Sequence, residues 1–378
     1  MSSTRRESNA RPLTIIELCL SQGRGGLEHY AADLVPDLSQ RGHRVIVVTR
    51  KGTDFSTRTG RAPALTLRPH GHLRWVGARR LGALIKDSLA DVIHIHRSAD
   101  LPLAVMAKRC AGDHPALVYS RHMLISRDRR GSWPHRFMFQ RVDRLLPITA
   151  GMGEEARRKL PIAPERVRPL VPGVLPAQTA ADCAEIRPPD TDFVVGCFSR
   201  VEPAKGQLEL IEAVAALRQQ GIRAGGVFAG SVMNPAYDKR LHDRVEELAL
   251  DNAVRFLGTL KDARPVMPCC DAIAMPSTGE ALGLVLVESM LMGVPVVGSA
   301  AGGVLEFIRN GETGLTYPVG DSEALTGQLK KLATDRDLAR ALGRAGRRAA
   351  TEQFDRETHL DRLEAIFHEA VAERADKR

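Results

Sequence analysis

Glu280 and Glu288 are two carboxylates with seven residues between them, in the segment PSTGEALGLVLVESMLMGVPVVGS. The apolar run over residues 271–277 predicts a buried parallel strand, and LVLVESMLMG predicts a helix that ends at Gly293. Ligands of open α/β sheets bind outside the carboxyl ends of the strands, so both carboxylates are expected at such an edge. Ionised carboxylates only accept hydrogen bonds, which suits a hydroxyl-rich ligand such as a sugar. Taken alone, the pair is equally consistent with solvated glutamates flanking a helix.

A second pair of charges follows another predicted strand. Residues 194–198 form an apolar run, and Arg200, Lys205 and Gly206 come next, before a helical pattern begins. Cations beside the positive N-terminus of a helix make an anion site, with Arg as a forked donor and Lys as a point charge. This spacing alone would also fit ordinary surface charge. Its weight comes from sharing a predicted domain with the two glutamates.

Five motifs follow one another along the chain: GGLE at residues 25–28, SRVEPAKG at 199–206, the two spaced glutamates, AGGVLEFI and NGETGL. In that order they resemble the retaining glycosyltransferases of family four, also called group 1, which have the GT-B fold and include lipopolysaccharide core enzymes. The resemblance covers nearly the whole chain. The chain departs from the family pattern at Leu282, where the family usually has Phe, and this conservative apolar change bears on the shape of the sugar pocket.

The resemblance implies transfer of a sugar from a nucleoside diphosphate sugar, a UDP-sugar being favoured, to an acceptor hydroxyl. Arg200 and Lys205 would stabilise the departing diphosphate, Glu288 would hold the ribose, and Glu280 would hold the donor sugar. His122 follows a predicted strand and resembles the family histidine that contacts the transferred sugar. No residue resembles the nucleophile of a double displacement, so attack on the same face, assisted by a leaving phosphate oxygen, is favoured.

Two pairs of glycines are further candidates for the donor site. Gly25 and Gly26 lie between a predicted strand and its helix, where missing side chains let backbone N–H groups approach a diphosphate, although a tight turn without a ligand would look the same. By resemblance, Gly302 and Gly303 would present backbone to the sugar and phosphate. The other residues that the resemblance places against the donor are Leu282, Gly283 and Leu284.

His94 and His96 alternate along a predicted strand and therefore lie on one face of it. Zinc sites use three or four protein or water ligands, and no third protein ligand is suggested nearby, so no metal site is predicted. His96 is expected to line the cleft on the acceptor side, the alternative being a satisfied core histidine. The further acceptor-side candidates are Arg121, Arg127 and Arg130.

Metal-dependent glycosyltransferases of another fold use a DxD motif, and two such triplets occur, at residues 190–192 and 335–337. Neither follows the carboxyl end of a predicted strand. Arg200, Lys205 and helix N-termini are expected to meet the phosphate charge instead. The chain is therefore predicted to work without a metal or another cofactor, with the nucleotide sugar as substrate.

Charge is unevenly distributed along the 378 residues. Residues 1–180 contain 30 Lys plus Arg against 15 Asp plus Glu, a balance of +15, whereas residues 181–378 contain 24 against 30, a balance of −6. A basic half attracts an anionic substrate, an anionic membrane face or nucleic acid. Nucleic acid is the weakest of these partners, because no recognised binding motif is present and the basic residues lack interleaved stacking aromatics, so no nucleic-acid partner is predicted. A generally arginine-rich composition remains the alternative.

Two basic stretches of the first half carry apolar residues. Residues 71–90 have the pattern of a basic amphipathic helix, for which packing against a core is favoured over a membrane surface. Residues 126–144 place six arginines around Trp133 and two phenylalanines. For this second stretch we expect contact with an anionic glycolipid or saccharide acceptor, or with a lipid surface.

Strand and helix patterns alternate through both halves, which predicts α/β architecture with parallel sheets. The expected fold is GT-B, with two Rossmann-like domains whose parallel sheets face a central cleft. A Pro- and Ala-rich segment without apolar periodicity separates them. The predicted parts are a disordered lead-in (1–12), an acceptor domain (13–175), a linker (176–190), a nucleotide-sugar domain (191–356) and a C-terminal helix crossing back to the first domain (357–378).

Composition sets the expected compartment. The six cysteines show no CxxC spacing, and Cys269 and Cys270 are neighbours that cannot easily bridge, so reduced thiols are predicted. No uninterrupted apolar run of about 20 residues is present, and the first dozen residues lack the apolar core of a signal peptide. A cytoplasmic protein, peripheral to the inner membrane at its cytoplasmic face, is expected.

Three functions are therefore weighed. The favoured one is a transferase that builds lipopolysaccharide core or another anionic envelope glycoconjugate. A nucleotide-sugar epimerase, or a transferase that makes a small soluble glycoside, is the alternative, and donor turnover without an acceptor would indicate the epimerase. A non-catalytic homologue that only binds partners ranks last, because all the charged motif residues are present.

Overall fold

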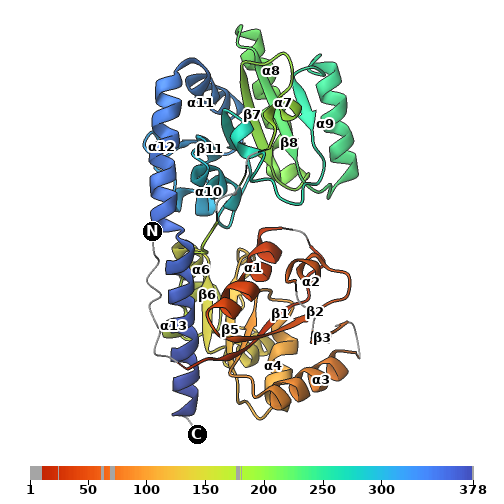
Figure 1. The fold of residues 1–378 in the computed structure, drawn as a ribbon, viewed down its shortest axis with the longest axis vertical. Helices are drawn as coiled ribbons and strands as arrows, with labels where there is room; N and C mark the ends of the chain where they lie inside the picture. The colour runs from red at the N-terminus through yellow and green to blue at the C-terminus, as the bar shows by residue number, and fades with distance from the viewer. Residues whose placement is uncertain are drawn as a thin grey trace. The chain divides into compact units, whose positions relative to one another are not determined.

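The computed structural model describes residues 11–23, 25–60, 64–68, 73–175, 179 and 181–376. The chain divides into two compact units (Figure 1), unit 1 with residues 1–172 and 357–378, and unit 2 with residues 173–356. Residues 1–10 of the predicted lead-in, and residues 176–178 and 180 of the predicted linker, lie outside the described part.

Unit 1 is built on a sheet of six parallel strands in the order β3-β2-β1-β4-β5-β6. Its strands are β1 (Thr14–Cys19), β2 (Arg44–Thr49), β3 (Leu65–Thr66), β4 (Val92–Ile95), β5 (Ala116–Arg121) and β6 (Arg144–Pro147). Its helices are α1 (Gly26–Gln40), α2 (Asp54–Arg58), α3 (Leu73–Ser88), α4 (Leu101–Cys110), α5 (Trp133–Phe139), α6 (Ala150–Lys159), the short η1 (Pro164–Arg166) and α13 (Arg356–Ala375).

Unit 2 repeats this topology, with a six-stranded parallel sheet in the order β12-β11-β10-β7-β8-β9. Its strands are β7 (Phe193–Phe198), β8 (Ala224–Ala229), β9 (Val254–Phe256), β10 (Ala272–Met275), β11 (Val296–Ser299) and β12 (Leu315–Tyr317). Its helices are α7 (Cys183–Ile186), η2 (Pro203–Lys205), α8 (Gln207–Gln219), α9 (Pro235–Glu247), η3 (Met267–Cys269), α10 (Leu284–Leu291), η4 (Gly302–Glu306), α11 (Ser322–Thr334) and α12 (Arg336–Gln353).

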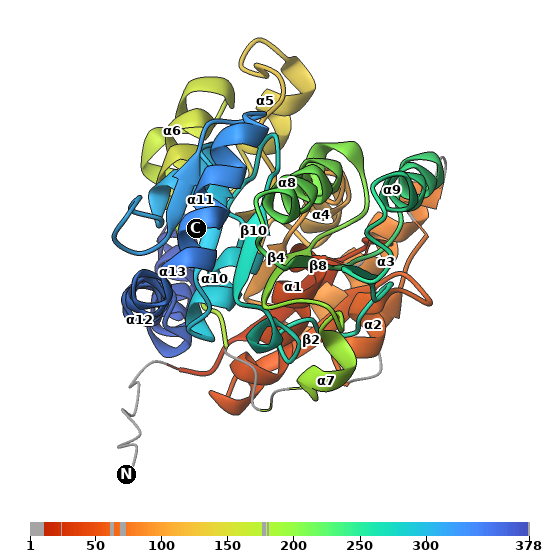
Figure 2. The same ribbon diagram turned by 90° about the horizontal axis from the view of Figure 1, so that it is seen from above.

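The two sheets share one rule of construction. Numbered within its own unit, each sheet runs 3-2-1-4-5-6, the doubly wound order of dinucleotide-binding folds. The inner strands are buried throughout because helices cover both faces, and such strands are nearly continuous apolar runs in sequence. In unit 2, α8 packs against β8 and α9 (Figure 2). The predicted α/β fold with two parallel sheets is confirmed.

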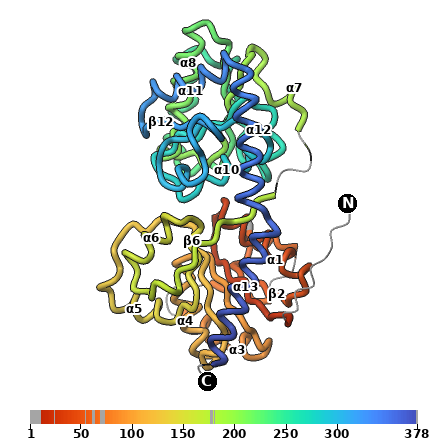
Figure 3. The backbone as a smooth tube through the Cα atoms, turned by 90° about the vertical axis from the view of Figure 1, so that its left-hand side faces the viewer, coloured from red at the N-terminus to blue at the C-terminus, as the bar shows by residue number. Residues whose placement is uncertain are grey.

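Helix α13 packs on unit 1 although it lies at the end of the chain. Its apolar face enters the core formed with α1 and β1 through Leu363 and Phe367. Ion pairs hold its middle and its C-terminal end: Arg41 with Glu364 at 3.0 Å, and Arg144 with Glu373. The tube in Figure 3 shows this blue helix running along unit 1 to the C-terminus.

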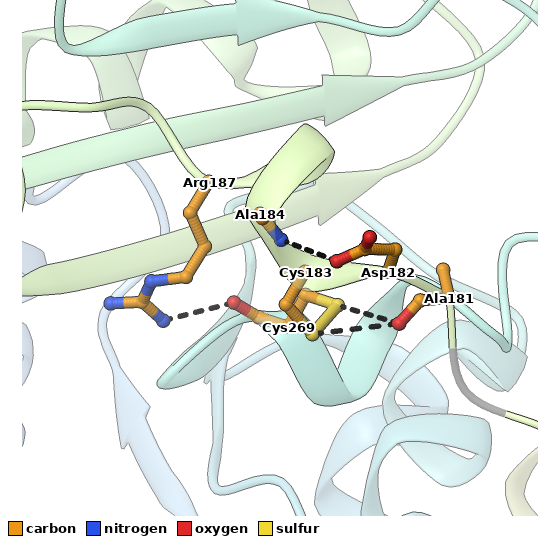
Figure 4. Close-up of a disulfide and its surroundings, with 6 residues drawn as sticks. All are labelled: Ala181, Asp182, Cys183, Ala184, Arg187 and Cys269. Carbon is orange, nitrogen blue, oxygen red and sulfur yellow. Dashed lines mark hydrogen bonds between the residues drawn. A yellow bond between two sulfur atoms is a disulfide. The ribbon is translucent and has the colours of Figure 1, made fainter.

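The cysteine prediction is wrong for one pair. Cys183 on α7 and Cys269 on η3 form a disulfide, with their Cα atoms 5.0 Å apart (Figure 4). The two residues are 86 positions apart, so no short spacing of cysteines in the sequence predicts this disulfide. Around it, the Arg187 guanidinium donates to the Cys269 carbonyl at 3.0 Å and thereby ties the segment that precedes β7 to η3.

Helix α3 occupies the first basic stretch and is packed against the core as expected, through Ala78, Leu81 and Ile85. Trp75 and Val76, however, are exposed at its N-terminal end. Within the part of the chain that the structure describes, no helix combines the length and the apolar character that crossing a bilayer requires.

Candidate functional site

Three loops of unit 2 meet where β7, β10 and β11 end. The backbone N–H of Thr278 donates to the Ala204 carbonyl at 3.0 Å, which joins the loop after β10 to the loop after β7. The N–H of Gly303 donates to the Glu280 carbonyl, also at 3.0 Å, and joins the loop after β11 to the same segment. The predicted site residues of unit 2 therefore share one frame of backbone hydrogen bonds.

Two glycines permit these loops to approach so closely. A Cβ atom at Gly206 would lie 2.1 Å from the Pro276 carbonyl oxygen, and one at Gly302 would lie 2.1 Å from the Glu280 carbonyl oxygen. Both glycines also have positive φ, 69° and 55°, which favours glycine. Any larger residue at either position would force the loops apart.

The charged side chains of this edge are paired with one another. Lys205 Nζ donates to Glu280 Oε1, and the Ser277 hydroxyl donates to the same oxygen at 2.9 Å. Arg200 Nη2 lies 2.8 Å from Glu202 Oε1. The structure thus brings the predicted Lys205 and Glu280 into direct contact, and Arg200 lies in the same loop as Lys205.

The remaining donor-side candidates surround helix α10. Gly283 is the N-cap of this helix, Leu282 before it is buried, and Leu284 is its first residue. Glu288 lies half-buried in the second turn. The carboxylates of Glu280 and Glu288 are therefore carried by a loop and by the helix that follows it, as predicted.

Sequence reasoning missed two polar residues that build this edge. Gln207 is 2% exposed, and its side-chain amide donates to the Arg200 carbonyl at 2.8 Å and to the Ser199 hydroxyl at 3.0 Å. Ser277 is fully buried beside Glu280. Their position directly beside the SRVEPAKG and GEALG segments was the available signal.

In unit 1 the glycine loop after β1 is held by a buried carboxylate. Glu28 is buried and accepts a hydrogen bond from the Ser21 hydroxyl, which in turn accepts the backbone N–H of Gly23 at 3.1 Å. Gly25 is the N-cap of α1 and Gly26 is its first residue. Glu28 therefore shapes the loop in addition to complementing the helix dipole, the role that its sequence position indicates.

A buried polar cluster lies inside the same sheet. The Glu17 carboxylate on β1 accepts one hydrogen bond from His94 Nδ1 at 2.9 Å and one from His96 Nε2 at 2.8 Å. His94 Nε2 lies 2.8 Å from the Ser120 hydroxyl on β5. All three charged or titratable side chains are at most 1% exposed, so His96 is enclosed in the core.

Burial and mutual contacts set the protonation of this cluster. Burial alone would raise the pKa of Glu17, but the charge and hydrogen bonds of His94 and His96 outweigh it and lower the pKa to about 2. Burial, aided by His94 and opposed by Glu17, lowers the pKa of His96 to about 4. At neutral pH the cluster therefore holds an ionised Glu17 beside a neutral His96.

His122 follows β5 and lies against the same group of rings. Its ring centroid is 4.9 Å from that of Tyr30 and 5.8 Å from that of His96. Burial, with further contributions from His96, His94 and His359, lowers the pKa of His122 well below its ordinary value. Its Nε2 is buried without a hydrogen-bond partner among the described residues. The Tyr30 hydroxyl lies 3.0 Å from His359 Nε2 on α13.

Glu17, His94 and His96 also have the composition of a metal site, with one ligand atom from each within 4.8 Å of the others. The expectation that no third ligand lies nearby is therefore wrong. A single acidic residue in the apolar run LTIIELCL was the missed signal. The set fits a metal poorly, because each oxygen of the Glu17 carboxylate already accepts a hydrogen bond from an imidazole, although His96 Nδ1 has no hydrogen-bond partner among the described residues.

The predicted acceptor-side arginines are separated by the structure. Arg121 is buried, and its Nη atoms donate to the Tyr119 hydroxyl at 3.0 Å and to the Leu124 carbonyl at 3.1 Å. Arg121 thus orders the loop that carries His122. Arg127 and Arg130 are exposed on the segment that leads to α5.

Exposed apolar residues flank these two arginines in the sequence. We call this stretch the basic-apolar surface and define it by Met123, Leu124, Arg127, Arg130 and Trp133. Trp133 is 72% exposed, Met123 64% and Leu124 47%. Trp133 stacks on Phe137, with ring centroids 5.9 Å apart.

Comparison with known proteins gives consistent results for both units. The family model for Glycosyltransferase Family 4 matches residues 24–178, and that for Glycosyl transferases group 1 matches residues 179–349. The chain is 29% identical over 343 residues to the "Lipopolysaccharide core biosynthesis glycosyltransferase LpsE" of Rhizobium meliloti (strain 1021), which covers 89% of this chain and 94% of the relative. It is 27% identical to a "D-inositol 3-phosphate glycosyltransferase" of Saccharomonospora viridis, over 92% of this chain and 90% of the relative.

Among solved structures, that of Anabaena Alr3699/HepE in complex with UDP and glucose superimposes with a TM-score of 0.81 and 23% sequence identity. The match covers 94% of this chain and all of the other. At this identity the likeness shows that the two proteins share a fold.

Proposed function

This chain belongs to the group 1 glycosyltransferases of family 4, which have the GT-B fold, and we propose that it moves a sugar from a nucleoside diphosphate sugar to an acceptor hydroxyl with retention at the anomeric carbon. The supporting observation is the frame of three loops in unit 2. It holds Arg200, Lys205 and Glu280 at the carboxyl edge of the sheet, where ligands of such folds bind.

In this proposal, different residues of unit 2 bind different parts of the donor. Arg200 and Lys205 bind the diphosphate and stabilise the negative charge that develops as it leaves. Glu280 accepts hydrogen bonds from the donor sugar, and Glu288 accepts them from the ribose. Backbone at Gly302 and Gly303 approaches the sugar and phosphate, where side chains would interfere. UDP is the favoured nucleotide, in keeping with the UDP complex of the HepE structure.

Retention is proposed from the family resemblance, and the described residues bear on how it would be achieved. Glu280 is paired with Lys205 and Ser277, and it is therefore poorly suited to form a covalent glycosyl intermediate. We propose that the acceptor attacks the face from which the diphosphate departs, with a phosphate oxygen taking the acceptor's proton. Arg200 and Lys205 meet the charge of the diphosphate, so the proposed step does not involve a metal.

Unit 1 supplies the acceptor side in this proposal. Neutral His122 offers a ring nitrogen to a hydroxyl of the transferred sugar, because its Nε2 has no hydrogen-bond partner among the described residues. Glu17, His94 and His96 support this region from the core. Gly25 and Gly26 present the start of α1 to the diphosphate.

We propose an anionic envelope glycoconjugate as the acceptor, with lipopolysaccharide core as the first candidate. The +15 charge of residues 1–180 attracts an anion, and the relative LpsE is described as a lipopolysaccharide core enzyme. The basic-apolar surface would contact the acceptor's lipid or the anionic inner membrane face, because cations and an exposed Trp suit an interface.

A small phosphorylated acceptor is a second candidate. It is supported by the relative whose name specifies inositol 3-phosphate, which is also anionic but carries no lipid. Transfer assays with a lipopolysaccharide core acceptor and with inositol 3-phosphate, each supplied with the same radiolabelled donor, separate the two. Product on the small acceptor alone would overturn the lipopolysaccharide proposal.

The donor assignment is tested first by thermal unfolding with UDP, GDP and ADP. A nucleotide at about 100 times its dissociation constant should stabilise the native state by about 2.7 kcal/mol. Sugars activated with the nucleotide that stabilises the protein are then supplied without an acceptor. Rapid conversion of the donor sugar to its epimer would overturn the transferase proposal, and no shift with any nucleotide would overturn the site.

A further inference from the structure

Both cations proposed for the diphosphate have a carboxylate partner within unit 2. Lys205 Nζ donates to Glu280 Oε1, and this pair is shielded, with 15% and 16% of the two side chains exposed. Arg200 pairs with Glu202 at 2.8 Å, and this pair is more open, at 46% and 24%. Glu202 belongs to neither of the two predicted glutamate positions.

We propose that Glu280 and Glu202 are exchangeable counter-ions that the donor's diphosphate displaces from Lys205 and Arg200. The exchange frees the Glu280 carboxylate to accept hydrogen bonds from the donor sugar only after the diphosphate has arrived. This inference rests on the proposed function. It adds an order of events to the site and a residue, Glu202, that opposes donor binding.

The loops themselves do not have to move for this exchange. Thr278 and Ala204 are joined through backbone at 3.0 Å, and Gly206 leaves no space between the two loops. Rotation of the Lys205 and Glu280 side chains is sufficient. After the exchange Glu280 keeps the hydrogen bond from the Ser277 hydroxyl, so its carboxylate is never without a donor.

Electrostatics gives the exchange its direction. An unpaired ion in a shielded position is costly, which favours the pairing of Lys205 with Glu280 until a stronger anion competes. A diphosphate brings more negative charge than one carboxylate and several acceptor oxygens, and therefore it competes successfully for Lys205 and Arg200. Affinity for the diphosphate is the difference between the new contacts and the carboxylate contacts that are lost.

This difference predicts an increase in affinity when a site carboxylate is neutralised. We expect Glu280→Gln to bind UDP about five-fold more tightly than wild type, and Glu202→Gln about two-fold, since partly exposed ion pairs contribute modestly. Transfer by Glu280→Gln should nevertheless fall, because its amide replaces an acceptor-only group at the sugar. If the carboxylates instead positioned the two cations for phosphate, both substitutions would weaken UDP binding.

Isothermal titration calorimetry with UDP measures these affinities on the full chain. The matched control is Glu312→Gln, which removes one negative charge from unit 2 at an exposed ion pair with Arg309 and should leave the affinity unchanged. Lys205→Gln should weaken UDP binding. In the Lys205→Gln background, adding Glu280→Gln should no longer increase the affinity, because the cation that the glutamate occupies is gone.

The outcomes separate this inference from the function on which it rests. If UDP, GDP and ADP all fail to bind wild type, or if Lys205→Gln binds like wild type, the donor site itself is wrong. If UDP binds and Lys205→Gln weakens it, but neither Glu280→Gln nor Glu202→Gln binds more tightly than Glu312→Gln, only the counter-ion exchange is overturned. If the affinity for UDP increases in Glu280→Gln but not in Glu202→Gln, the exchange takes place at Lys205 only, and Glu202 has no part in it.

Discussion

The two units place different chemistry on the same strand order. At the edge of unit 2, Arg200, Lys205 and Glu280 are partly exposed and paired through side chains that can change partner. In unit 1, Glu17 and His96 are enclosed in the core and bonded to one another. One sheet thus carries a charged, accessible edge, and the other carries a buried network beneath its edge.

This difference shows that the fold supplies a position and the residues supply the chemistry. A diphosphate needs cations that water and ligand can reach, which requires loop residues beyond the strand ends. A neutral imidazole such as His122 needs the opposite, because burial is what lowers its pKa. Each edge should therefore respond to substitution in its own way, unit 2 through activity and unit 1 through stability and pH.

The largest effect is expected at the cations of unit 2. Lys205→Ala, and separately Arg200→Ala, should reduce transfer about 100-fold to 1,000-fold, as removal of one charge-stabilising donor does in other enzymes. The midpoint of thermal unfolding should stay near that of wild type, because both side chains are partly exposed. Steady-state assays with donor and acceptor measure the loss.

Arg309→Ala is the matched control for this prediction, since Arg309 is an exposed arginine of the same unit that pairs only with Glu312 in the contacts described for it. Its activity should match wild type. Near-normal transfer by both Lys205→Ala and Arg200→Ala would contradict the division of chemistry between the two edges.

The next effect is expected on the stability of unit 1. Glu17→Gln removes the charge from the buried network and sets an amide N–H against an imidazole N–H, so one hydrogen bond is lost. Leaving a buried polar group without its hydrogen bond costs about 1–3 kcal/mol. Denaturant unfolding, followed by circular dichroism, should show this loss of unfolding free energy.

Glu154→Gln serves as the control, because Glu154 is 76% exposed in its pair with Arg157. It should change stability by less than about 0.5 kcal/mol. Equal stabilities of Glu17→Gln and Glu154→Gln would mean that the buried network does not hold unit 1 together.

Much of the fold could be predicted from the sequence because buried parallel strands are continuous apolar runs. The apolar runs over residues 194–198 and 271–277 correspond to β7 and β10 within two residues at either end, and the helix end predicted at Gly293 is confirmed. The edge strands β3 and β12 have two and three residues, too few for a pattern. They were not predicted.

The site of unit 2 could be predicted for a similar reason, since its cations lie within one motif and its carboxylates within another. What failed depended on distant partners. Glu17 bonds to His94, 77 residues away, and Cys183 pairs with Cys269 across 86 residues. Arg121 was grouped with exposed arginines, but a buried Tyr119 hydroxyl and a backbone carbonyl hold its guanidinium.

A smaller effect is expected on the pH dependence of stability, because the buried histidines of unit 1 should lower the free energy of unfolding in acid. His96 has a folded pKa of about 4, below the usual value of 6.5, so the unfolded chain binds its proton first as the pH falls. The lowered pKa of Glu17, about 2 against 4.5, adds a loss of stability at lower pH. The contribution of His96 is complete above pH 6.5 and should be lost at about 1.4 kcal/mol per pH unit between pH 6.5 and about 4.

Unfolding free energies at pH 7.5 and 5.5 check this response. His122→Gln should lose less stability between the two values, because the pKa of buried His122 is lowered in the same direction. His114 is exposed, so His114→Gln should behave like wild type. An unchanged pH response in His122→Gln would mean that His122 does not contribute to the acid sensitivity.

The smallest effect is expected for the basic-apolar surface of unit 1. Substitutions there test whether the positive charge of this unit binds the protein to an anionic membrane. Near an anionic bilayer each Arg contributes about 1 kcal/mol, so Arg127→Gln should bind phosphatidylglycerol vesicles about five-fold more weakly in co-sedimentation at low salt. Arg309→Gln makes the same charge change on unit 2 and should bind like wild type. Because Trp133 is 72% exposed, Trp133→Ala should weaken binding in a way that added salt does not reproduce. Equal binding by Arg127→Gln and Arg309→Gln would mean that net charge alone, and no particular surface, attracts the protein to lipid.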